Sequence, residues 1–467
     1  MSTRPLTPKE ILKEILRTKS GLIGVIILVL MVVLSIFAVI YTPYDIVNAW
    51  NDPVFWQSNP RLAAPEWINI IAGINLPKTI ILGHNNFYKS EYYVQIAGLK
   101  YVNLRGTFKF QYDYFPSELS LFLKVNYSNK SPLVKVTFVR PDGNMVTLYE
   151  GIVESHNSVI YISTDPKIRK RIRTFLEKFT KGEEAYMIYP EIILFAKPDR
   201  DMWDADKARV LKGTYELRIE MVGYNPTDTL EAKLIVYGRV YGLVGTDDLR
   251  RDLLVGIAWG APITLAFGLI AAVLISVIQV LLGIISAWFG GIIDEAIQRL
   301  SDILLVLPFL PIVILISFIY GVDIWRLLLI VVVLSIVGST TKVARSIALQ
   351  VKSEQYVEAA ISYGASGWRI IFLYIFPRLL PYTIANIVMV TPSMIFLEAA
   401  LALIGLIDPR NPTWGRIIAD AYDGGAAVHG YWWWILIPAS LIILVASAFA
   451  MIGYSLDKIV NPRLRER

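Results

Sequence analysis

Residues 356–377 read Tyr-Val-Glu-Ala-Ala-Ile-Ser-Tyr-Gly-Ala-Ser-Gly-Trp-Arg-Ile-Ile-Phe-Leu-Tyr-Ile-Phe-Pro. The first half of this stretch is polar and helix-forming, yet long apolar runs flank the stretch on both sides. A chain that crosses a membrane repeatedly and keeps a structured segment between two crossings offers that segment to a soluble partner. We therefore expect a membrane protein with a docking segment between two of its spans.

The composition supports a membrane protein. The 467 residues are 55% hydrophobic and 18% charged, with a mean hydropathy of +0.51. This apolar excess is typical of a chain that spans a bilayer, and the remaining charge indicates a sizeable polar part. Cysteine is absent, which excludes disulfides and thiolate metal sites. The net charge of +6 is explained by cytoplasmic loops rich in Lys and Arg, so we expect no nucleic-acid partner.

Several apolar runs are long enough to cross a bilayer as helices, which takes roughly 20 residues. The first run is too long for a signal peptide and lacks a small-residue cleavage site, so we expect it to be retained. Pro308, Pro311 and Pro392 are expected to bend helices, because proline lacks a backbone donor. The sequence therefore predicts an all-α membrane bundle of about six transmembrane helices. The predicted spans are about 21–41, 256–287, 303–320, 326–343, 382–406 and 432–454.

Basic residues predict the orientation, because Lys and Arg collect in short cytoplasmic loops. Three clusters occur: before the first span, between the fourth and fifth spans, and after the last span. With six spans and a cytoplasmic N-terminus, all three lie inside, and residues 46–244 lie outside the cell membrane. The clusters are Arg4, Lys9, Lys13, Arg17 and Lys19; Lys342, Arg345, Lys352, Arg369 and Arg378; and Lys458, Arg463, Arg465 and Arg467.

The chain divides into three predicted parts: residues 1–45, an extracytoplasmic insert at 46–244, and a permeation core at 245–467. In the insert, apolar residues alternate with polar ones around 119–125, 134–138, 215–221 and 232–236. Such alternation predicts half-buried strands and a β-rich, sandwich-like domain between the first two spans.

One helix is predicted within the insert, with Asp165-Pro166 at its start and an apolar stripe at Ile168, Ile172, Phe175 and Phe179. Its other face is strongly basic. That face is either a solvated surface or a docking face for an acidic partner.

The segment 353–377 predicts a helix–turn–helix, which we call the elbow. Ser353 is expected to cap a first helix that ends at Tyr363, and Gly364 is expected to take a left-handed turn. Ser366 is expected to cap a second helix, and Pro377 to mark the start of the next span. The alternative is an amphipathic loop that rests on the membrane surface.

Polar residues inside the predicted spans are candidates for a translocation path. A charge at the centre of a bilayer costs about 2.5–3.5 kcal/mol on insertion scales, so such groups usually face a bundle interior or a cavity. The alternative role is hydrogen bonding between helices. The candidates are Glu398, Asn386, Thr391, Ser393 and Gln279, with Asp302 as a further ionisable group.

Catalytic and metal-binding patterns are absent from the sequence. No G-x-x-x-x-G-K-[ST] motif occurs, so the chain has no phosphate-binding loop of its own. The three His residues lie far apart and show no metal-ligand spacing. We therefore expect a protein that is not an enzyme and holds no metal or cofactor.

Three motifs carry a resemblance to a known family. Glu358, Ala359, Ala360 and Gly364 match the E-A-A-x-x-x-G coupling pattern of ABC importer permeases, and Ile370, Phe376 and Pro377 match its later positions. Gly245-Thr246-Asp247, Arg251-Asp252 and Gly260 resemble a G-T-D…R-D…G lead-in. Leu403, Gly405, Leu406, Pro409, Pro412, Trp414 and Gly415 resemble an F-L-G-L-G…P-x-P-x-W-G stretch. The chain resembles the dipeptide/oligopeptide/nickel permeases, second subunit type, over about 1–45 and 242–462.

The chain departs from this pattern at a few positions. Arg250 stands where the family usually has Gly, and Ile404 and Ile407 replace a Phe and a Gly. The insert replaces a short connection with roughly 200 residues, which is tolerated because the entropy of loop closure grows slowly with length. The insert is expected to dock a substrate-binding protein, to replace part of it, to protect the mouth of the path, or simply to decorate the structure.

The resemblance implies a permease subunit of an ATP-driven importer for peptides or other small oligomeric solutes, with oligosaccharides or nickel as further substrates. It implies a second homologous permease, two ATPase subunits that bind ATP and Mg, and an extracytoplasmic solute-binding protein as partners. The ATPases would act through residues 353–377. The alternative is a surface-anchored binding or scaffold protein. A passive channel fits less well, because it needs no cytoplasmic elbow.

Overall fold

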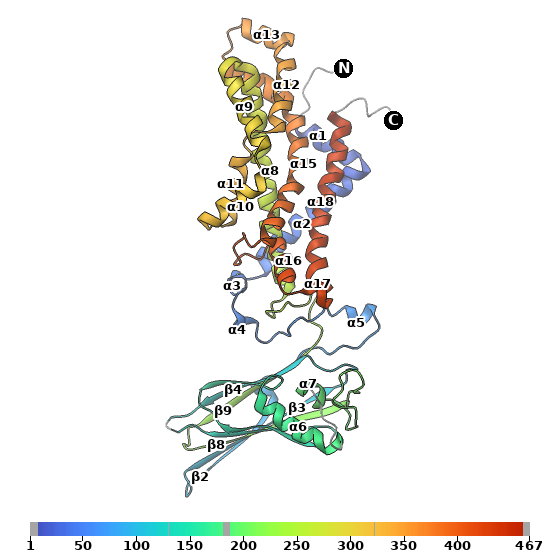
Figure 1. Ribbon diagram of the computed structural model, residues 1–467, viewed down its shortest axis with the longest axis vertical. Coiled ribbons are helices and arrows are strands. Elements are labelled where there is room, and N and C mark those ends of the chain that lie inside the picture. The colour runs from blue at the N-terminus through green and yellow to red at the C-terminus, as the bar shows by residue number, and fades with distance from the viewer. Residues whose placement is uncertain (1–7, 129, 181–186, 322, 461–467) are drawn as a thin grey trace. The chain divides into compact units, whose positions relative to one another are not determined.

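The computed structural model describes residues 8–128, 130–180, 187–321 and 323–460. Arg4, Arg463, Arg465 and Arg467 of the basic clusters lie outside these residues. The chain forms two compact units, Met1–Asn51 with Val255–Arg467, and Asp52–Leu254. The first unit is helical and the second contains the described strands (Figure 1). The structure therefore confirms a helical part and a β-rich part.

Long apolar helices make up the helical unit. Four are long and apolar enough to cross a membrane: α2 (Lys19–Tyr41), α8 (Leu253–Phe289), the run Gly367–Leu403, and α18 (Trp432–Val460). Two bent pairs also pass if each is one span: α9 (Gly291–Val306) with α10 (Phe309–Tyr320), and α11 (Ile324–Leu334) with α12 (Ser339–Lys352). The described residues therefore hold between four and six spans, in agreement with the prediction of about six.

Two of the predicted spans are bent, and the bend expected at Pro308 is confirmed. The run 303–320 is divided by an 84° bend between α9 and α10, where Pro308 directly precedes α10. Pro311 lies in the first turn of α10, where a missing N–H costs no hydrogen bond, and it causes no break. The run 326–343 is divided by a 49° bend between α11 and α12. Pro392 lies inside α15 (Phe376–Leu403), which continues through it.

The predicted span 382–406 starts too late. A continuous helical run begins at Gly367 with α14 (Gly367–Ile370), passes through the π-helical turn η2 (Ile371–Ile375) and continues as α15. Pro377 would clash with the carbonyl four residues earlier in a regular α-helix. The π-turn, in which the N–H of Phe376 bonds to the carbonyl of Ile371, changes the hydrogen-bond pattern just before this proline. Pro377 therefore lies within a continuous helical run and does not start one.

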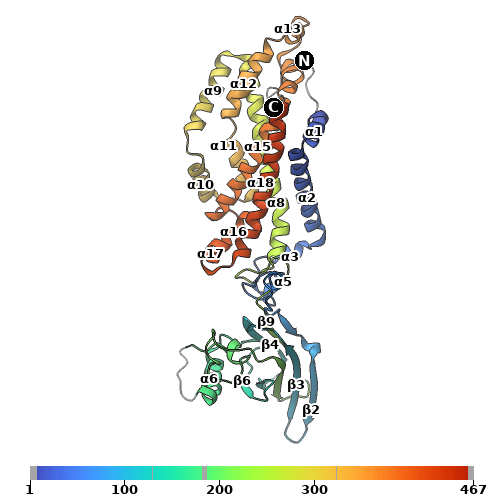
Figure 2. The same cartoon turned by 90° about the vertical axis from the view of Figure 1, so that its right-hand side faces the viewer.

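Helices from both ends of the chain pack together in this unit. α1 (Pro8–Arg17) and α2 lie against α18, as the two views show (Figure 2). Gly24 of α2 allows this contact, because a Cβ there would lie 2.6 Å from the carbonyl oxygen of Ala448. Thr18 Oγ1 donates a 2.7 Å hydrogen bond to Ser455 Oγ. α13 (Gln355–Ser362) lies at one end of the unit, and α16 (Trp414–Asp423) and α17 (Ala426–His429) lie at the other (Figure 1).

The second unit is a two-sheet β structure. One sheet has the strand order β1-β9-β4-β7 and the other β2-β3-β8-β5-β6, with antiparallel pairing throughout. The predicted strands are confirmed as β4, β5, β8 and β9, and the predicted helix as α6. The strands are β1 (Ile80–Leu82), β2 (Phe87–Val94), β3 (Leu99–Phe110), β4 (Glu118–Asn126), β5 (Leu133–Val139), β6 (Met145–Ile152), β7 (Asn157–Tyr161), β8 (Gly213–Gly223) and β9 (Thr229–Tyr237).

The remaining helices are α6 and several short ones. α6 (Pro166–Thr180) packs against β6, and Asp165 accepts the N–H of Lys167 at 2.7 Å as its cap. The others are α3 (Tyr44–Asn48) in the helical unit, and α4 (Pro53–Trp56), α5 (Ile68–Ile71), η1 (His84–Asn86) and α7 (Pro190–Ile193).

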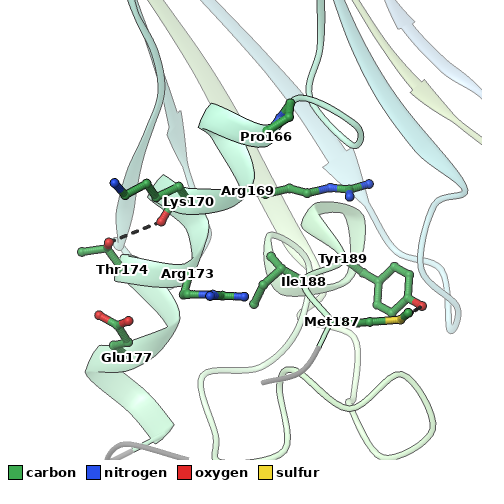
Figure 3. A pocket seen from close by; sticks show the side chains of 9 residues that line it. All are labelled: Pro166, Arg169, Lys170, Arg173, Thr174, Glu177, Met187, Ile188 and Tyr189. Carbon is green, nitrogen blue, oxygen red and sulfur yellow. Dashed lines mark hydrogen bonds between the residues drawn. The ribbon is translucent and has the colours of Figure 1, made fainter. Parts of the chain in front are cut away.

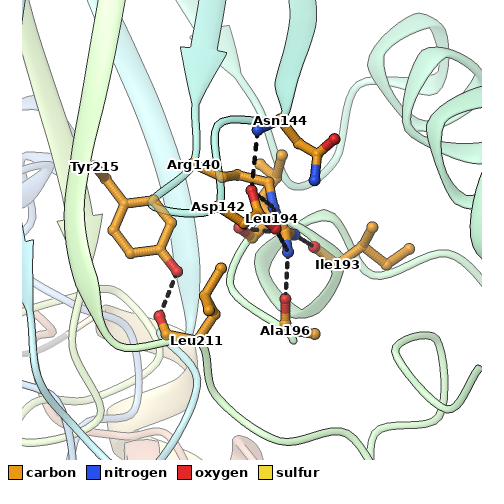
Figure 4. Close-up of polar contacts among 8 residues, drawn as sticks. All are labelled: Arg140, Asp142, Asn144, Ile193, Leu194, Ala196, Leu211 and Tyr215. Atoms are coloured by element: carbon orange, nitrogen blue, oxygen red, sulfur yellow. Dashed lines mark hydrogen bonds and ion pairs between the residues drawn. The ribbon is translucent and has the colours of Figure 1, made fainter. Parts of the chain in front are cut away.

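A buried arginine ties the end of β5 to the segment around α7 (Figure 4). The Arg140 side chain is 0% exposed and lies 2.9 Å from Asp142 Oδ2. Its guanidinium donates to the carbonyls of Ile193 and Ala196, each at 2.5 Å. Because a buried charge is tolerated only when it is paired and hydrogen-bonded, this network fixes the loop against the sheet.

Arg250 has an unusual backbone conformation, with φ at +67°. This is a left-handed region that favours glycine, and the resembling family usually has Gly at this position. The side chain compensates through contacts within the same unit. It donates to the carbonyl of Asn59 at 2.9 Å, pairs with Glu118, and lies with its guanidinium 4.3 Å from the ring centre of Tyr237.

We expect Arg250→Ala to destabilise the β unit more than Arg250→Gly. Both changes remove the contacts to Glu118 and Tyr237, but only alanine keeps the left-handed strain of about 1–2 kcal/mol. Hydrogen exchange of the β4 and β9 amides in the full-length protein measures the difference. Equal protection in the two variants would show that the backbone strain at this position is negligible.

Candidate functional site: the elbow and the polar contacts of the spans

The first arm of the elbow is the short helix α13. Its predicted end is confirmed, because Tyr363 is the C-terminal cap and Gly364 follows with φ at +80°. The predicted cap at its start is wrong. Ser353 Oγ donates to the carbonyl of Gln350 at 2.8 Å and therefore closes the end of α12, while Glu354 precedes α13 without a side-chain cap bond. A sequence pattern cannot decide which of two adjacent helices a serine will cap.

The second arm is α14, and it is continuous with the span α15. Ser366 occupies the predicted cap position but makes no side-chain cap bond. Gly367 packs directly on α8, since a Cβ there would lie 2.6 Å from Trp288 Nε1. The ring of Trp368 meets that of Phe289 edge-on, with the centroids 5.5 Å apart. The elbow is therefore held against the end of α8 at this point.

An apolar cluster holds the two arms together. Val357 of α13 and Ile370 of the second arm are members of it. Ala360 of α13 is also buried. Phe376 packs against the cluster from its edge, and Pro377 is half-buried beside it. The other buried members are Val280, Ile284, Ala287, Ala344, Ala348, Val351, Ile371, Ile375 and Leu379, which come from α8, α12, η2 and α15. The cluster thus joins the elbow to three long helices.

The opposite face of α13 is open. Glu358 and Ala359 are exposed. The two alanines of the motif therefore lie on different faces of α13, because Ala360 is buried. Ile361 is 47% exposed and Tyr363 is 91% exposed. Exposed apolar side chains gathered around a carboxylate on a short projecting helix are typical of a protein-binding surface.

Sequence reasoning missed the contacts that fix α12 beneath the elbow. The Lys352 ammonium donates to the carbonyls of Ala287 and Trp288, at 3.2 and 2.9 Å, and so caps the C-terminal end of α8. The Arg345 guanidinium makes two bonds to Asp294, at 2.6 and 2.5 Å. Two features of the sequence could have indicated these contacts: a lysine in the last turn of α12 and an acidic residue in the first turn of α9.

Gln279 and Asn386 lie in one strip of polar contacts between α8, α12 and α15. Gln279 Nε2 donates to the carbonyl of Ser335 at 2.6 Å, at the break between α11 and α12. Asn386 Nδ2 donates to Ser276 Oγ at 2.8 Å, and its Oδ1 accepts from Thr340 at 3.2 Å. These bonds join neighbouring helices, and Gln279 satisfies a carbonyl that the break leaves free.

The other path candidates lie elsewhere. Thr391 Oγ1 bonds to the carbonyl of Ile387 in its own helix at 2.7 Å, and Ser393 is exposed. Glu398 is fully buried, and Gly415 near the start of α16 faces it, since a Cβ on Gly415 would lie 3.0 Å from Glu398 Oε2. Asp302 pairs with Lys342 at 2.6 Å in an exposed position. Whether any of these residues lines a path stays a prediction.

Close packing brings two of the sequence motifs together. Gly260 of α8 lies against the segment before α16, where a Cβ would meet the carbonyl oxygen of Pro412 at 2.6 Å. Trp414 is fully buried, and its Nε1 donates to the carbonyl of Ile257 at 2.9 Å. The glycine, the proline and the tryptophan therefore form one contact between α8 and the chain that follows α15.

Comparisons with known proteins agree with this arrangement. Residues 279–466 match the family model of the binding-protein-dependent transport system inner membrane component. The dipeptide transport system permease protein of Bacillus subtilis is 32% identical over 222 residues, covering 47% of this chain and 68% of the relative. The oligopeptide transport system permease protein of the same organism is 34% identical, covering 48% and 72%. The di/tripeptide transport system permease protein of Pseudomonas aeruginosa is 29% identical, covering 49% and 74%.

These relatives are transport subunits rather than enzymes, and nothing in them supports a surface-anchored binding or scaffold protein. The resemblance seen in the three sequence motifs is thereby confirmed. The chain is a multi-pass membrane protein that belongs to the permease family of binding-protein-dependent ABC importers.

Proposed function

We propose that this permease carries peptides or other small oligomeric solutes, oligosaccharides included, across the cell membrane by alternating access driven through the elbow. The observation that carries the mechanism is the continuous helical run from Gly367 to Leu403, which starts at the elbow and is long enough to span a bilayer. The substrate class is supported by the relatives, which are named as dipeptide, oligopeptide and di/tripeptide permeases.

The proposed assembly contains a second homologous permease, two ATPase subunits and an extracytoplasmic solute-binding protein. The ATPases would bind ATP and Mg, because the chain itself has no phosphate-binding loop. They would bind the open face of α13 around Glu358, Ala359 and Tyr363.

A displacement of the elbow is transmitted to the spans through the buried side chains of the elbow. A displacement of α13 moves Val357, which is buried in a cluster with residues of α8, α12 and α15. Close-packed apolar clusters shift as units, because a void in such a core is costly. ATP-driven closure of the ATPases would therefore tilt α15 and α12 together and change which side of the bundle is open.

The proposed orientation places α13 and both termini in the cytoplasm and residues 46–244 outside. Its support is the cluster of Lys and Arg around the elbow, since basic residues favour the cytoplasmic side. In this orientation α16 and α17, at the opposite end of the helical unit, face outward.

We expect Gly364→Val to uncouple transport. A valine at φ +80° costs about 1–2 kcal/mol or more in the left-handed region, although its Cβ would meet no atom within 4 Å. The turn between the arms would change shape while membrane insertion stays intact. ATP hydrolysis by the assembled complex should continue while solute uptake falls by about tenfold.

Gly321→Val is the matched control. Gly321 also has a positive φ, at +55°, with no atom within 4 Å of its Cβ position, but it ends α10 away from the elbow. Its backbone cost is similar, so uptake should stay close to the native rate after correction for protein level. Normal uptake by Gly364→Val, or an equal loss in both variants, would argue against a coupling role.

Single-cysteine variants test the partner and the orientation, because the native chain has no cysteine and hence no background labelling. Tyr363→Cys, on the open face of α13, should cross-link to an ATPase subunit and react with thiol reagents only from the cytoplasm. Val428→Cys, 86% exposed in α17, should give no ATPase cross-link and should react from outside. Labelling of both positions from the same side would refute the orientation.

A further inference from the structure

The proposed transport mechanism leaves the basic face of α6 without a role. This helix of 15 residues carries six Lys or Arg side chains and a single acidic one, Glu177. Its apolar stripe, which includes Ile168, Ile172 and Phe175, is buried in the core of the β unit. The positive charge therefore lies entirely on the outward side.

A hollow of about 690 Å³ lies between α6 and residues 187–189 (Figure 3). Arg169 and Arg173 extend from the helix toward Ile188 and Tyr189 (Figure 3), and Lys170, Thr174 and Glu177 also line the hollow. Met187 is 65% exposed. The hollow thus has a mainly basic wall on α6, in which Glu177 is the acidic member among the described residues, and an apolar, aromatic wall at 187–189.

The positive charge at this hollow is only partly compensated. Arg169 donates from Nε and Nη2 to the carbonyl of Ser163, at 3.2 and 3.0 Å, a neutral partner that leaves its charge in place. Among the residues that the structure describes, the side chains of Lys170 and Arg173 make no ion pair or hydrogen bond. A planar guanidinium binds a carboxylate with two parallel bonds, so the free group at Arg173 fits an incoming carboxylate.

We propose that this hollow docks an acidic polypeptide segment of an extracytoplasmic partner, namely the binding protein on which transport by this family depends. The inference rests on the proposed function, which places the β unit outside. Arg, Tyr and Met are enriched at the cores of protein interfaces, and all three line this hollow. A lipid surface would use the charge of α6 but not the apolar wall.

The test measures binding of a fluorescent, terminally blocked octaglutamate peptide to the full-length protein in nanodiscs of zwitterionic lipid, by anisotropy. The peptide should bind at about 50 mM salt and weaken as salt rises toward about 500 mM, because exposed charges are screened. The double variant Lys170→Glu/Arg173→Glu should weaken binding by about tenfold or more. Lys109→Glu, an exposed basic position on β3, is the matched control and should bind as the native protein does.

Several outcomes would overturn the proposal. These are no binding of octaglutamate to the native protein, equal binding of an octaglutamine peptide, or an equal loss in the Lys109→Glu control. Tight binding of anionic-lipid vesicles through Lys170 and Arg173, without peptide binding, would assign the face to a membrane instead.

This assay separates the inference from the proposed function. It contains no ATP and no ATPase subunit, so Gly364→Val should bind octaglutamate as the native protein does. If octaglutamate does not bind, the docking proposal fails, but the proposed coupling through the elbow is unaffected. If Gly364→Val transports solute at the native rate, the proposed coupling role fails, but the octaglutamate binding measurement still holds.

Discussion

The burial of Val357 is the contact on which the shape of the elbow depends. α13 has only eight residues, and a helix that short is not stable by itself in water. Burying a valine side chain contributes about 1.5–3 kcal/mol, whereas ordering eight residues costs roughly 8–16 kcal/mol. The helical hydrogen bonds and the contacts with neighbouring helices must therefore supply the rest. The elbow is therefore a structure that the surrounding spans impose. Any motion of α8, α12 or α15 must move it, and the reverse also holds.

Arg250 shows how the insert and the family pattern are adapted to each other. The resembling family usually has glycine there, and the backbone of this chain still adopts the conformation that glycine favours. The cost of a larger side chain is offset by contacts that only the inserted domain provides, from Asn59, Glu118 and Tyr237. The contacts that hold Arg250 in this conformation thus all come from the β unit.

Much of this architecture could be predicted from the sequence. The elements that could not be predicted are those without a local pattern of apolar residues. β4, β5, β8 and β9 were predictable because each buries one face, which produces strict alternation of apolar residues. β2 was not, because nearly all of its residues are exposed and no alternation results. The elbow motif was recognisable by its residue types. The bend at Pro308 was predictable because proline lacks a backbone donor. The bend between α11 and α12 was missed because hydropathy averages over a break, and the bond from Gln279 to Ser335 at this break joins residues far apart in sequence.

The unbroken run of 37 residues from Gly367 to Leu403 has a mechanical consequence. At 1.5 Å per residue it is about 55 Å long, well beyond the roughly 30 Å of a hydrocarbon core. Such a rod acts as a lever with its fulcrum inside the bilayer. A tilt of about 5° displaces one end relative to the other by about 5 Å, roughly the rise of one helical turn. In the proposed mechanism, a movement small enough to keep the buried cluster intact at the elbow would thereby displace the far end of the run by several ångströms.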